Sequence, residues 1–457
     1  MPRPMSHPNV LLVIADDHQA DAISAVGHPV VRTPVIDELV SGGTTFTQVR
    51  IMGSLMPAVC APSRACLLTG RNVFRADTEP LLSHGPEYQV CLPRDACTLP
   101  ECFRAAGYET YFTGKWHNCR ASLNRSFSSG SRIFLGGMSD HAAVPVWDYD
   151  PSGEYRAENA RIGKGFSSEI FADAAIDFIN GRNNECPFFL CLAFTSPHDP
   201  RTPPETFRRL YDESQIPLPE NFLPAHPFDN GELHIRDEEL AAFPRQPEEI
   251  RRHLADYYGM ISHHDAQIGR VVEALRLNGV LESTIIVYLS DHGLAVGQHG
   301  LMGKQNLYEH SLRVPLVLCG PGVPRGERRR LLAYSFDLYA TLCALAGVDT
   351  PPGLDSRSLV PALADPSRTV RDELGSVYMD RQRMVTDGRW KLIRYHVDGT
   401  ERVQLFDLAR DPRELHDLAG LPIHAPIIRR LAATLRQWQE KVGDRWMPVE
   451  ALAPVAK

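Results

Sequence analysis

The chain has 457 residues, of which 43% are hydrophobic and 23% charged, and its formal net charge at pH 7 is -8. This length and composition are typical of a globular protein with a large core. The acidic balance argues against a general nucleic-acid binder, although it leaves room for a local basic pocket. The longest apolar runs, such as LLVIA and PFFLCLAF, suit buried strands and are too short to cross a bilayer.

The N-terminal segment, MPRPMSHPNVLLVIADDH, has no apolar stretch of signal-peptide length and no small-residue cleavage site before its first polar cluster. This pattern predicts a cytoplasmic protein, unless a leader has been removed. The ten cysteines are scattered and form no CxxC pair, which argues against a zinc site or a disulfide framework. Most of them are expected to be small buried side chains.

Strand-like apolar runs alternate with helix-like periodic segments through most of the chain. Strands are predicted at Asn9–Ala15, Glu109–Thr113, Phe188–Phe194, Thr284–Leu289 and Leu316–Leu318. Helices are predicted at Thr33–Val40, Thr98–Ala106, Ser168–Asn180, Glu248–Leu277 and Phe336–Ala346. Because the strands are continuously apolar, the pattern predicts an α/β fold with a large, mostly parallel sheet that helices cover on both faces.

Three parts of the chain depart from this alternation. Residues 120–165 are rich in Ser, Gly and Arg, and residues 199–247 in Pro and charged groups. Both are expected to be surface excursions that form walls of a substrate pocket. Further on, short strands and a final helix predict a small antiparallel sheet with a packed helix, at Ser376–Met379, Gln382–Thr386, Trp390–Tyr395, Gln404–Asp407 and Ile427–Val442. We therefore expect a catalytic domain at 1–365 and a C-terminal α+β subdomain at 366–457.

Acidic residues follow two of the predicted strands at the point where each strand ends. Asp16 and Asp17 follow the first strand, and Asp291 and His292 follow TIIVYLS. Ligands of open parallel sheets bind outside the carboxyl ends of the strands. Three carboxylates at that edge would repel one another without a cation, and oxygen ligands suit Ca²⁺, Mg²⁺ or Mn²⁺. The alternative is that the motifs are helix caps or turns, but their occurrence at two strand ends favours a metal site.

Cationic and titratable residues follow further strands. Lys115 and His117 come after YETYFT, His198 comes after PFFLCLAFTSP, and Lys304 lies in the loop GQHGLMGKQNLYEHSL. Each alone would more often be a solvated turn residue. Together at one sheet edge, they are groups that can bind an anion and move protons.

The segment CAPSRACLLTGR presents a cysteine at the start of a predicted helix. If Ala61 is the first helical residue, Pro62 lies in the first turn and Cys60 occupies the cap, under the positive end of the helix dipole. Arg64 lies on the same side as Cys60, whereas Cys66 lies roughly opposite, toward the core. Cys60 is thus a candidate thiolate nucleophile. A soft sulfur beside carboxylates and a hard metal is nevertheless a poor match, because that position calls for oxygen.

C-x-P-S-R followed by L-T-G-R resembles the signature of type I sulfatases in the alkaline-phosphatase superfamily. The similarity covers nearly the whole chain, from the ADD strand end through FTGKWH, SPH and SDHG to KLIRY and LFDLARDP. In that family a maturation enzyme oxidises the cysteine to Cα-formylglycine. The hydrate of this aldehyde is an oxygen ligand and an oxygen nucleophile, which resolves the mismatch at Cys60.

The resemblance implies a role for each residue at the strand ends. The metal ligands would be Asp16, Asp17, Asp291, His292 and modified Cys60; many family members have Asn at the position of His292. Arg64 and Lys115 would hold the hydrate and the sulfate, and Lys304 would bind a sulfate oxygen. His198 would protonate the leaving alkoxide. His117 would then accept a proton from the second hydroxyl of the hydrate, which expels sulfate and regenerates the aldehyde.

The resemblance implies hydrolysis of a sulfate monoester to inorganic sulfate and an alcohol, with one divalent cation, Ca²⁺ in the first place and Mg²⁺ or Mn²⁺ as alternatives. A small sulfated carbohydrate is the expected substrate, followed by choline sulfate. A phosphonate monoester or phosphodiester hydrolase of the same superfamily is a second interpretation. The intact C-x-P-S-R motif favours a sulfatase, because those relatives often depart from it. An inactive sulfate-binding relative is a third, but Arg64, Lys115, His117, His198 and Lys304 are all present. No nucleic-acid or membrane partner is expected, and a homo-oligomer remains an open alternative.

The two excursions offer candidates for substrate recognition. Their arginines could bind a carboxylate or a second sulfate on a sugar, although for any single one a solvated surface position is the stronger alternative; they are Arg120, Arg125, Arg132, Arg156, Arg161 and Arg201. Trp147, Tyr149 and Tyr155 could stack on a sugar or enclose a choline ammonium, with ordinary packing as the stronger alternative.

Overall fold

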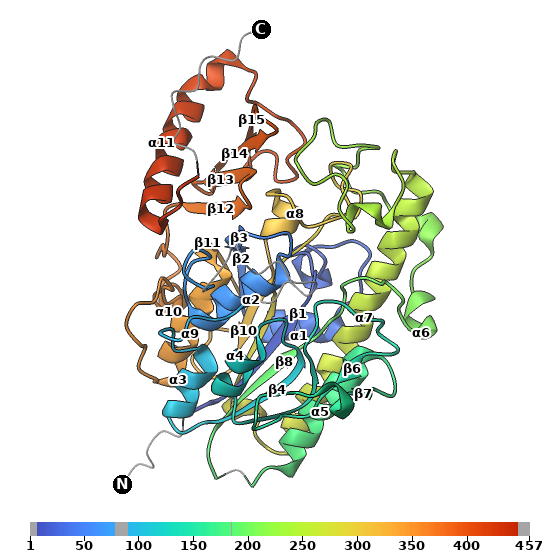
Figure 1. Ribbon diagram of the computed structural model, residues 1–457, viewed down its shortest axis with the longest axis vertical. Helices are drawn as coiled ribbons and strands as arrows, with labels where there is room; N and C mark the ends of the chain where they lie inside the picture. The colour runs from blue at the N-terminus through green and yellow to red at the C-terminus, as the bar shows by residue number, and fades with distance from the viewer. Residues whose placement is uncertain (1–6, 78–89, 184, 447–457) are drawn as a thin grey trace.

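A central sheet of eight strands organises the protein in the computed structural model, which describes residues 7–77, 90–183 and 185–446 (Figure 1). The strand order is β11-β2-β10-β9-β1-β8-β4-β5. In chain order these strands are β1 Asn9–Ala15, β2 Gly43–Arg50, β4 Glu109–Lys115, β5 Ser129–Phe134, β8 Phe188–Ala193, β9 Thr284–Ser290, β10 Leu316–Cys319 and β11 Glu327–Tyr334. Strand β10 runs antiparallel to both of its neighbours, and the other pairings are parallel. The predicted mostly parallel sheet is therefore confirmed, with one reversed strand.

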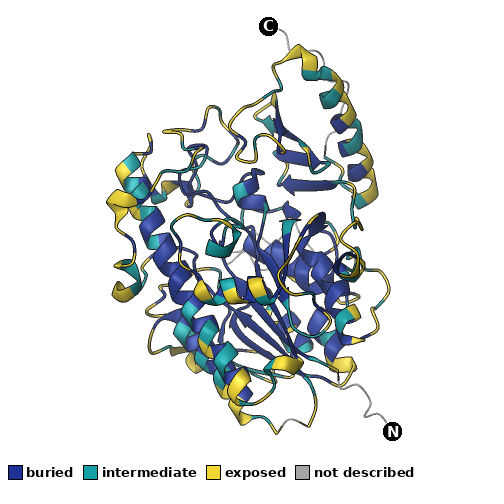
Figure 2. Ribbon diagram, turned by 180° about the vertical axis from the view of Figure 1, so that it is seen from behind, coloured by how far each residue is buried: buried dark blue, intermediate teal, exposed yellow. Residues whose placement is uncertain are grey.

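Helices cover both faces of this sheet. Alternate residues of β1 point into two different hydrophobic clusters, with Leu11 and Val13 in one and Val10 and Leu12 in the other. The first cluster includes α1 Pro34–Gly42, α5 Ser167–Gly181 and α7 Pro247–Leu277, and the second includes α2 Cys60–Thr69, α3 Leu99–Ala105 and α9 Leu338–Ala346. Figure 2 shows the sheet as buried between these layers. Such double coverage explains why the strands are apolar on both sides.

The remaining elements are short. They are the helices α4 Arg120–Ser126, α6 Glu205–Arg208, α8 Glu309–Leu312 and α10 Val360–Ala364, and a two-stranded ribbon of β6 Pro145–Val146 and β7 Arg161–Ile162. Within the described residues, none of the helices combines the length and the apolarity needed to cross a membrane.

The C-terminal part forms a second sheet at one end of the molecule (Figure 1). Its strands are β12 Leu374–Tyr378, β13 Gln382–Thr386, β14 Trp390–Val397 and β15 Thr400–Asp407, and α11 Ala425–Val442 packs on them. A short strand from the N-terminal part, β3 Gly53–Ser54, adds to this sheet by pairing parallel with β12. The C-terminal sheet is thus tied to the segment that leads into α2. The division at residues 1–365 and 366–457 stays a prediction.

Three strands of the central sheet differ from the sequence expectation. The predictions did not include β2, β5 and β11, whose sequences are GTTFTQVR, SGSRIF and ERRRLLAY. Each lies toward an edge of the sheet and mixes polar with apolar residues, so it lacks the continuous apolar run that marks the central strands. Helix α2 begins at Cys60, one residue earlier than expected, so the N-cap is Val59 and not Cys60. The helix ends at Thr69, and Gly70 follows as its C-cap in the left-handed conformation, with φ of 62°.

Gly114 is the second-last residue of β4 and shapes the end of this strand. Two of the predicted site residues, Lys115 and His117, come shortly after it. Its φ is 99°, and a Cβ atom at this position would lie 1.8 Å from the carbonyl oxygen of Ala193 on β8. The pairing of β4 with β5 shifts register between Phe112 and Gly114. Only glycine combines this backbone conformation with so close an approach. The glycine therefore sets the direction in which the chain leaves the sheet at Lys115.

Replacement of Gly114 by alanine is expected to destabilise the protein by about 3 kcal/mol or more, because it adds a backbone clash to the cost of a left-handed residue. Gly107 offers a matched control: its φ is 88°, but an added Cβ would meet no atom within 4 Å. Gly107→Ala should therefore cost about 1 kcal/mol. Thermal and urea unfolding measure both changes, and equal effects of the two substitutions would contradict the clash.

Candidate active site

The structure brings all ten predicted site residues into one buried cluster at the carboxyl ends of the central strands. They are Asp16, Asp17, Cys60, Arg64, Lys115, His117, His198, Asp291, His292 and Lys304. Strands β1, β4, β8 and β9 deliver most of them, α2 delivers the cysteine and the arginine, and the loop between β9 and α8 delivers the second lysine. The residues thus lie together at the sheet edge where ligands of such sheets bind, and their roles stay predictions.

Cys60 lies among cations and imidazoles. Its Sγ is 3.0 Å from Nε2 of His292 and 3.4 Å from Nζ of Lys304, and His117 also hydrogen-bonds to the thiol. Burial by itself would raise the pKa of the Cys60 thiol, but Lys115, Lys304 and His292 lower this pKa well below its ordinary value. The position is therefore one that stabilises a negative charge.

Two cations lie against the carboxylates on the other side of the cluster. Nε of Arg64 donates to Oδ2 of Asp291 at 2.8 Å, and its Nη1 donates to the carbonyl oxygen of Lys115 at 2.6 Å. Nζ of Lys115 donates to Asp16. The hydroxyl of Ser63 donates to the carbonyl oxygen of Asp291 at 2.5 Å, which joins α2 to the end of β9. These bonds fix the cations before any ligand arrives.

The carboxylates differ in how well their charge is compensated. Burial and the neighbouring Asp291 raise the pKa of Asp16 to about 7. For Asp17, burial acts in the same direction, but Lys304 and His198 lower the pKa well below its ordinary value. Nζ of Lys304 donates to Oδ1 of Asp17 at 2.9 Å. The negative charge around Asp16 and Asp291 therefore exceeds what the nearby cations offset.

The donor set fits a hard divalent cation. Oδ1 of Asp16 and Oδ1 of Asp291 are buried, and neither has a hydrogen-bond partner among the described residues. Ligand atoms of Asp16, Cys60, Asp291 and His292 lie within 4.8 Å of one another. Carboxylate oxygens suit Ca²⁺ or Mg²⁺, whereas the sulfur of Cys60 does not. The fit becomes complete only if this position carries an oxygen.

Two histidines at the cluster have pKa values displaced in opposite directions. Nδ1 of His198 lies 2.8 Å from the carbonyl oxygen of Asp199, and its Nε2 lies 3.8 Å from Oδ2 of Asp17. Burial opposes the shift, but these two aspartates raise the pKa of His198 to about 9. Burial and Lys115 lower the pKa of His117 to about 4. At neutral pH the first is a proton donor and the second a proton acceptor, a pairing typical of acid–base catalysis.

Sequence reasoning missed several residues that support the cluster. Asp199 follows His198 directly, and its Oδ1 accepts a hydrogen bond of 3.1 Å from Nη2 of Arg236. The hydroxyl of Tyr257 on α7 donates to the carbonyl oxygen of Asp17 at 2.7 Å. The adjacency of Asp199 to a candidate acid was a usable signal. Arg236 and Tyr257 lie far away in the sequence and carried none.

The aromatic candidates for substrate contact serve the packing of their own excursion. Tyr155 is buried, and its hydroxyl donates to Oδ1 of Asn124 at 2.8 Å. The hydroxyl of Tyr149 donates to the carbonyl oxygen of Asn124 at 3.2 Å, and Nε1 of Trp147 donates to that of Arg156 at 3.0 Å. The packing alternative therefore describes all three residues.

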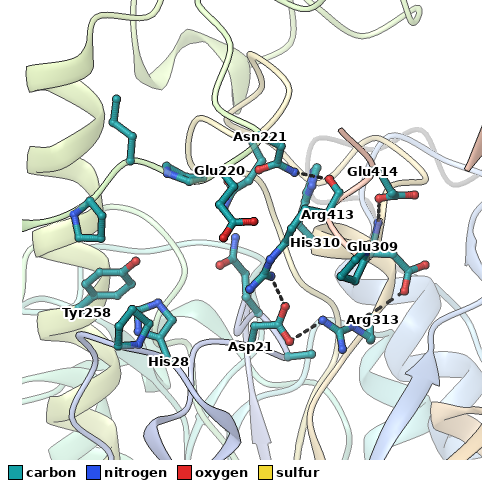
Figure 3. Close-up of a pocket in the computed structure, with 18 residues that line it drawn as sticks. Asp21, His28, Glu220, Asn221, Tyr258, Glu309, His310, Arg313, Arg413 and Glu414 are labelled. Atoms are coloured by element: carbon teal, nitrogen blue, oxygen red, sulfur yellow. Dashed lines mark hydrogen bonds and ion pairs between the residues drawn. The ribbon is translucent and has the colours of Figure 1, made fainter. Parts of the chain in front are cut away.

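A cavity of about 330 Å³ lies apart from the cluster, between α7, the segment 217–221 and the segment 412–414 (Figure 3). Its lining includes none of the ten site residues. Asp21 lies between the guanidinium groups of Arg313 and Arg413 and pairs with both. The charges on this side of the cavity are thus compensated within the protein, and we assign the chemistry to the cluster.

Comparison with solved structures shows the same fold. A structure described as a complex with its substrate D-glucosamine-2-N,6-O-disulfate superimposes with a TM-score of 0.80 at 23% identity, covering 96% of this chain and 99% of that one. A phosphonate monoester hydrolase of Agrobacterium radiobacter superimposes with a TM-score of 0.74, also at 23% identity, covering 95% and 96%. The fold is therefore alkaline-phosphatase-like, as predicted.

Curated relatives match along almost the whole chain. An N-acetylglucosamine-6-O-sulfatase of Bacteroides thetaiotaomicron is 25% identical over 96% of this chain and 87% of its own length. A choline-sulfatase of Rhizobium meliloti is 27% identical with the same coverage. The multifunctional alkaline phosphatase superfamily protein PehA of Trinickia caryophylli is 28% identical over 96% and 97%.

Family models identify both parts of the chain. The C-terminal model of N-sulphoglucosamine sulphohydrolase matches residues 297–441. The sulfatase model matches residues 8–348, a span that includes the whole cluster. The chain therefore belongs to the sulfatase family of the alkaline-phosphatase superfamily and is a sulfuric ester hydrolase.

Proposed function

We propose that this sulfatase hydrolyses the sulfate monoester of a small sulfated carbohydrate, with a formylglycine made from Cys60 and one divalent cation. The observation that carries the proposal is the position of Cys60. Its Sγ lies 3.4 Å from Nζ of Lys304 and 3.0 Å from Nε2 of His292, next to carboxylates whose charge is only partly compensated. An oxygen at this position would be both a nucleophile for sulfur and a ligand for a hard cation.

Two groups that the chain does not encode would complete the site. A maturation enzyme that acts on residues 60–71 would convert Cys60 to formylglycine, whose hydrate supplies the nucleophilic oxygen. Asp16, Asp17, Asp291 and His292, with the modified residue, would hold the cation, Ca²⁺ in the first place. The cation supplies charge stabilisation at the sulfate oxygens. Oδ1 of Asp16 and Oδ1 of Asp291 have no hydrogen-bond partner among the described residues, which supports this assignment.

The cations of the chain would bind the sulfate. Arg64, Lys115 and Lys304 are held in place by hydrogen bonds to the site carboxylates, so little reorganisation is needed when the anion enters. Negative charge builds up on the sulfate and on the leaving oxygen during ester cleavage. Preorganised positive groups stabilise that charge more than they stabilise the ground state, which lowers the barrier.

Two histidines would move the protons. His198 would donate a proton to the leaving alcohol, and His117 would accept one from the hydrate oxygen that remains. Asp199 orients His198 through the contact of its carbonyl oxygen with Nδ1, and Nε2 is turned toward the cluster, 3.8 Å from Oδ2 of Asp17. His117 hydrogen-bonds to the Cys60 position, where the second hydroxyl of the hydrate would stand. The opposite displacement of the two pKa values supports this division of roles.

Relatives favour a carbohydrate as the alcohol portion. One curated relative is named an N-acetylglucosamine-6-O-sulfatase, and one similar structure is described with a glucosamine disulfate. The choline-sulfatase relative supports choline sulfate as a second candidate. Steady-state hydrolysis of N-acetylglucosamine-6-O-sulfate and choline sulfate by the matured enzyme separates them.

Hydrolysis of a phosphonate monoester or phosphodiester is the alternative reaction, since a phosphonate monoester hydrolase is among the similar structures. The test compares kcat/KM for 4-nitrophenyl sulfate with kcat/KM for 4-nitrophenyl phenylphosphonate. We expect the sulfate to be preferred. A higher kcat/KM for the phosphonate would mean that phosphonate hydrolysis, and not sulfate hydrolysis, is the primary activity.

Removal of the nucleophile should abolish turnover. Cys60→Ala is expected to lower kcat for 4-nitrophenyl sulfate on the order of 10⁵-fold or more, as is usual for a covalent nucleophile. Cys66→Ala is the matched control, because this second buried thiol of α2 lies six residues further on and burial raises its pKa. The control should keep most of its activity once folded. Comparable losses in both variants would argue against a special role for Cys60.

Metal binding should depend on the two carboxylates, Asp16 and Asp291, that each have one oxygen without a hydrogen-bond partner among the described residues. Asp291→Asn is expected to reduce Ca²⁺ affinity by at least about tenfold, because it removes one charge from the donor set. Asp95→Asn, at an exposed carboxylate, is the control. Calorimetric titration of the chelator-treated proteins with Ca²⁺ measures affinity independently of turnover. Equal affinity of the Asp291 variant and the wild type would place the metal elsewhere.

The proposed role of His198 predicts a dependence on the leaving group. An alcohol of a sugar needs a proton as it leaves, whereas 4-nitrophenolate hardly does. His198→Gln should therefore reduce kcat about 10²- to 10⁴-fold for N-acetylglucosamine-6-O-sulfate and far less for 4-nitrophenyl sulfate. His416→Gln, at an exposed histidine, is the control. A uniform loss on both substrates would mean that His198 acts in binding and not as the acid.

A further inference from the structure

Arg201 is a buried cation for which the described residues supply no hydrogen-bond acceptor. The residue is 8% exposed, and none of its three guanidinium nitrogens has a hydrogen-bond partner among the described residues. The guanidinium carbon lies 5.8 Å from the ring centroid of Tyr257. Such a cation–π contact offsets only part of the cost of removing the charge from water. A buried arginine in this condition is exceptional, since buried charges are as a rule paired.

The other arginines singled out in the excursions all have acceptors. Their partners are the carbonyl oxygen of Glu154 for Arg120, Glu101 for Arg125, Asp177 for Arg132, Glu154 for Arg156 and Asp148 for Arg161. Most of these pairs are partly or fully solvated. Five of the six candidates are thus ordinary surface or structural arginines, and Arg201 alone among them is both buried and unpaired.

Arg201 belongs to the loop that carries the proposed proton donor. It follows His198 by three residues, and the Tyr257 ring beneath its guanidinium group donates its hydroxyl to the carbonyl oxygen of Asp17. His253 lies one turn before Tyr257 on α7, and its Nε2 also has no hydrogen-bond partner among the described residues. Burial lowers the pKa of His253 to about 4, and the nearby charge of Arg201 contributes to this.

The nearby carboxylate of Asp199 interacts with the charge of Arg201 but makes no hydrogen bond or close ion pair with it. Nη2 of Arg236 donates to Oδ1 of Asp199, and the same oxygen lies 3.3 Å from Nδ1 of His198. The carboxylate of Asp199 is therefore committed to two other cations. The guanidinium donors of Arg201 therefore have no acceptor among the described residues and are left to meet a group from outside the protein.

We propose that Arg201 forms an anion subsite for a second negatively charged group, a sulfate or a carboxylate, on the alcohol portion of the substrate. The planar guanidinium fork matches either group with two parallel hydrogen bonds, and low exposure strengthens the attraction. This inference rests on the proposed function, because His198 defines the leaving-group side. It makes the natural substrate a sulfate ester that carries at least one more anionic group.

The test measures how monosaccharides inhibit the hydrolysis of 4-nitrophenyl sulfate. D-glucosamine-2-N-sulfate carries a sulfate, D-glucuronate carries a carboxylate, and N-acetylglucosamine is the neutral reference. The wild type should bind at least one of the two anionic sugars roughly tenfold or more tightly than the neutral one. The sugar that is preferred identifies the anion as a sulfate or a carboxylate.

Substitutions assign this preference to Arg201. Arg201→Met keeps the length of the side chain without its charge and should abolish the preference for the anionic sugar. Arg201→Lys keeps the charge without the fork and should retain part of it. Arg209→Met is the matched control, because Arg209 is an exposed arginine that pairs with Glu205; it should leave the preference unchanged. A wild type without any preference, or a preference that survives in Arg201→Met, would overturn the inference.

A purely structural role for Arg201 predicts a different result for stability. Loss of a structural arginine lowers the melting temperature, whereas removal of an unpaired buried charge should leave the melting temperature unchanged or raise it. A lower melting temperature for Arg201→Met would therefore count against the subsite.

The inference and the proposed function can fail separately. If the matured wild type hydrolyses neither 4-nitrophenyl sulfate nor N-acetylglucosamine-6-O-sulfate, the proposed function fails. Calorimetric titration with the same three sugars then still decides whether Arg201 selects for an anion.

Discussion

The structure depends on the electrostatic problem posed by three carboxylates that are buried together at the carboxyl end of one sheet. Asp16 and Asp17 follow β1, and Asp291 follows β9. Because these two strands are neighbours in the sheet, the three carboxylates lie close together. Mutual repulsion and desolvation would make such a group unstable unless positive charge were supplied. Three buried cations, Arg64, Lys115 and Lys304, come from α2, from β4 and from a loop to meet them. The rest of the fold holds these elements in register.

This compensation is incomplete in a way that matches sulfate chemistry. The cations pair with some carboxylate oxygens, yet one oxygen each of Asp16 and Asp291 has no hydrogen-bond partner among the described residues. A hard cation would satisfy these oxygens, and the same charges would then receive an anionic ester. The sulfur of Cys60 does not suit such a cation. That mismatch links the family signature in the sequence to the geometry of the site.

Much of the fold could be predicted because the central strands are apolar on both faces. Strands β1, β8 and β9 stand out as continuous hydrophobic runs, and the polar residues that follow them mark the sheet edge. The edge strand β11 could not be recognised, since ERRRLLAY contains four charged residues and pairs with only one neighbour. The reversal of β10 could not be predicted either, because direction depends on long-range pairing and not on local pattern.

In the site, too, local sequence features could be predicted and long-range contacts could not. Residues adjacent to strand ends were found from position alone, and the family resemblance assigned roles to them. Tyr257 and Arg236 act through contacts with Asp17 and Asp199 that no local signal announces. Arg201 was indistinguishable in sequence from the other excursion arginines, because whether an arginine is paired depends on which carboxylates the fold brings near it. Only the three-dimensional structure distinguishes Arg201 from the other arginines.

Mass spectrometry of the peptide that contains Cys60 tests the central claim most directly. The protein would be co-expressed with a formylglycine-generating enzyme, digested, and compared with protein from cells that lack this enzyme. The account predicts a peptide of the mass expected for formylglycine in the first preparation, and sulfatase activity in proportion to its abundance. Full activity from a preparation in which Cys60 is entirely an unmodified thiol would contradict it.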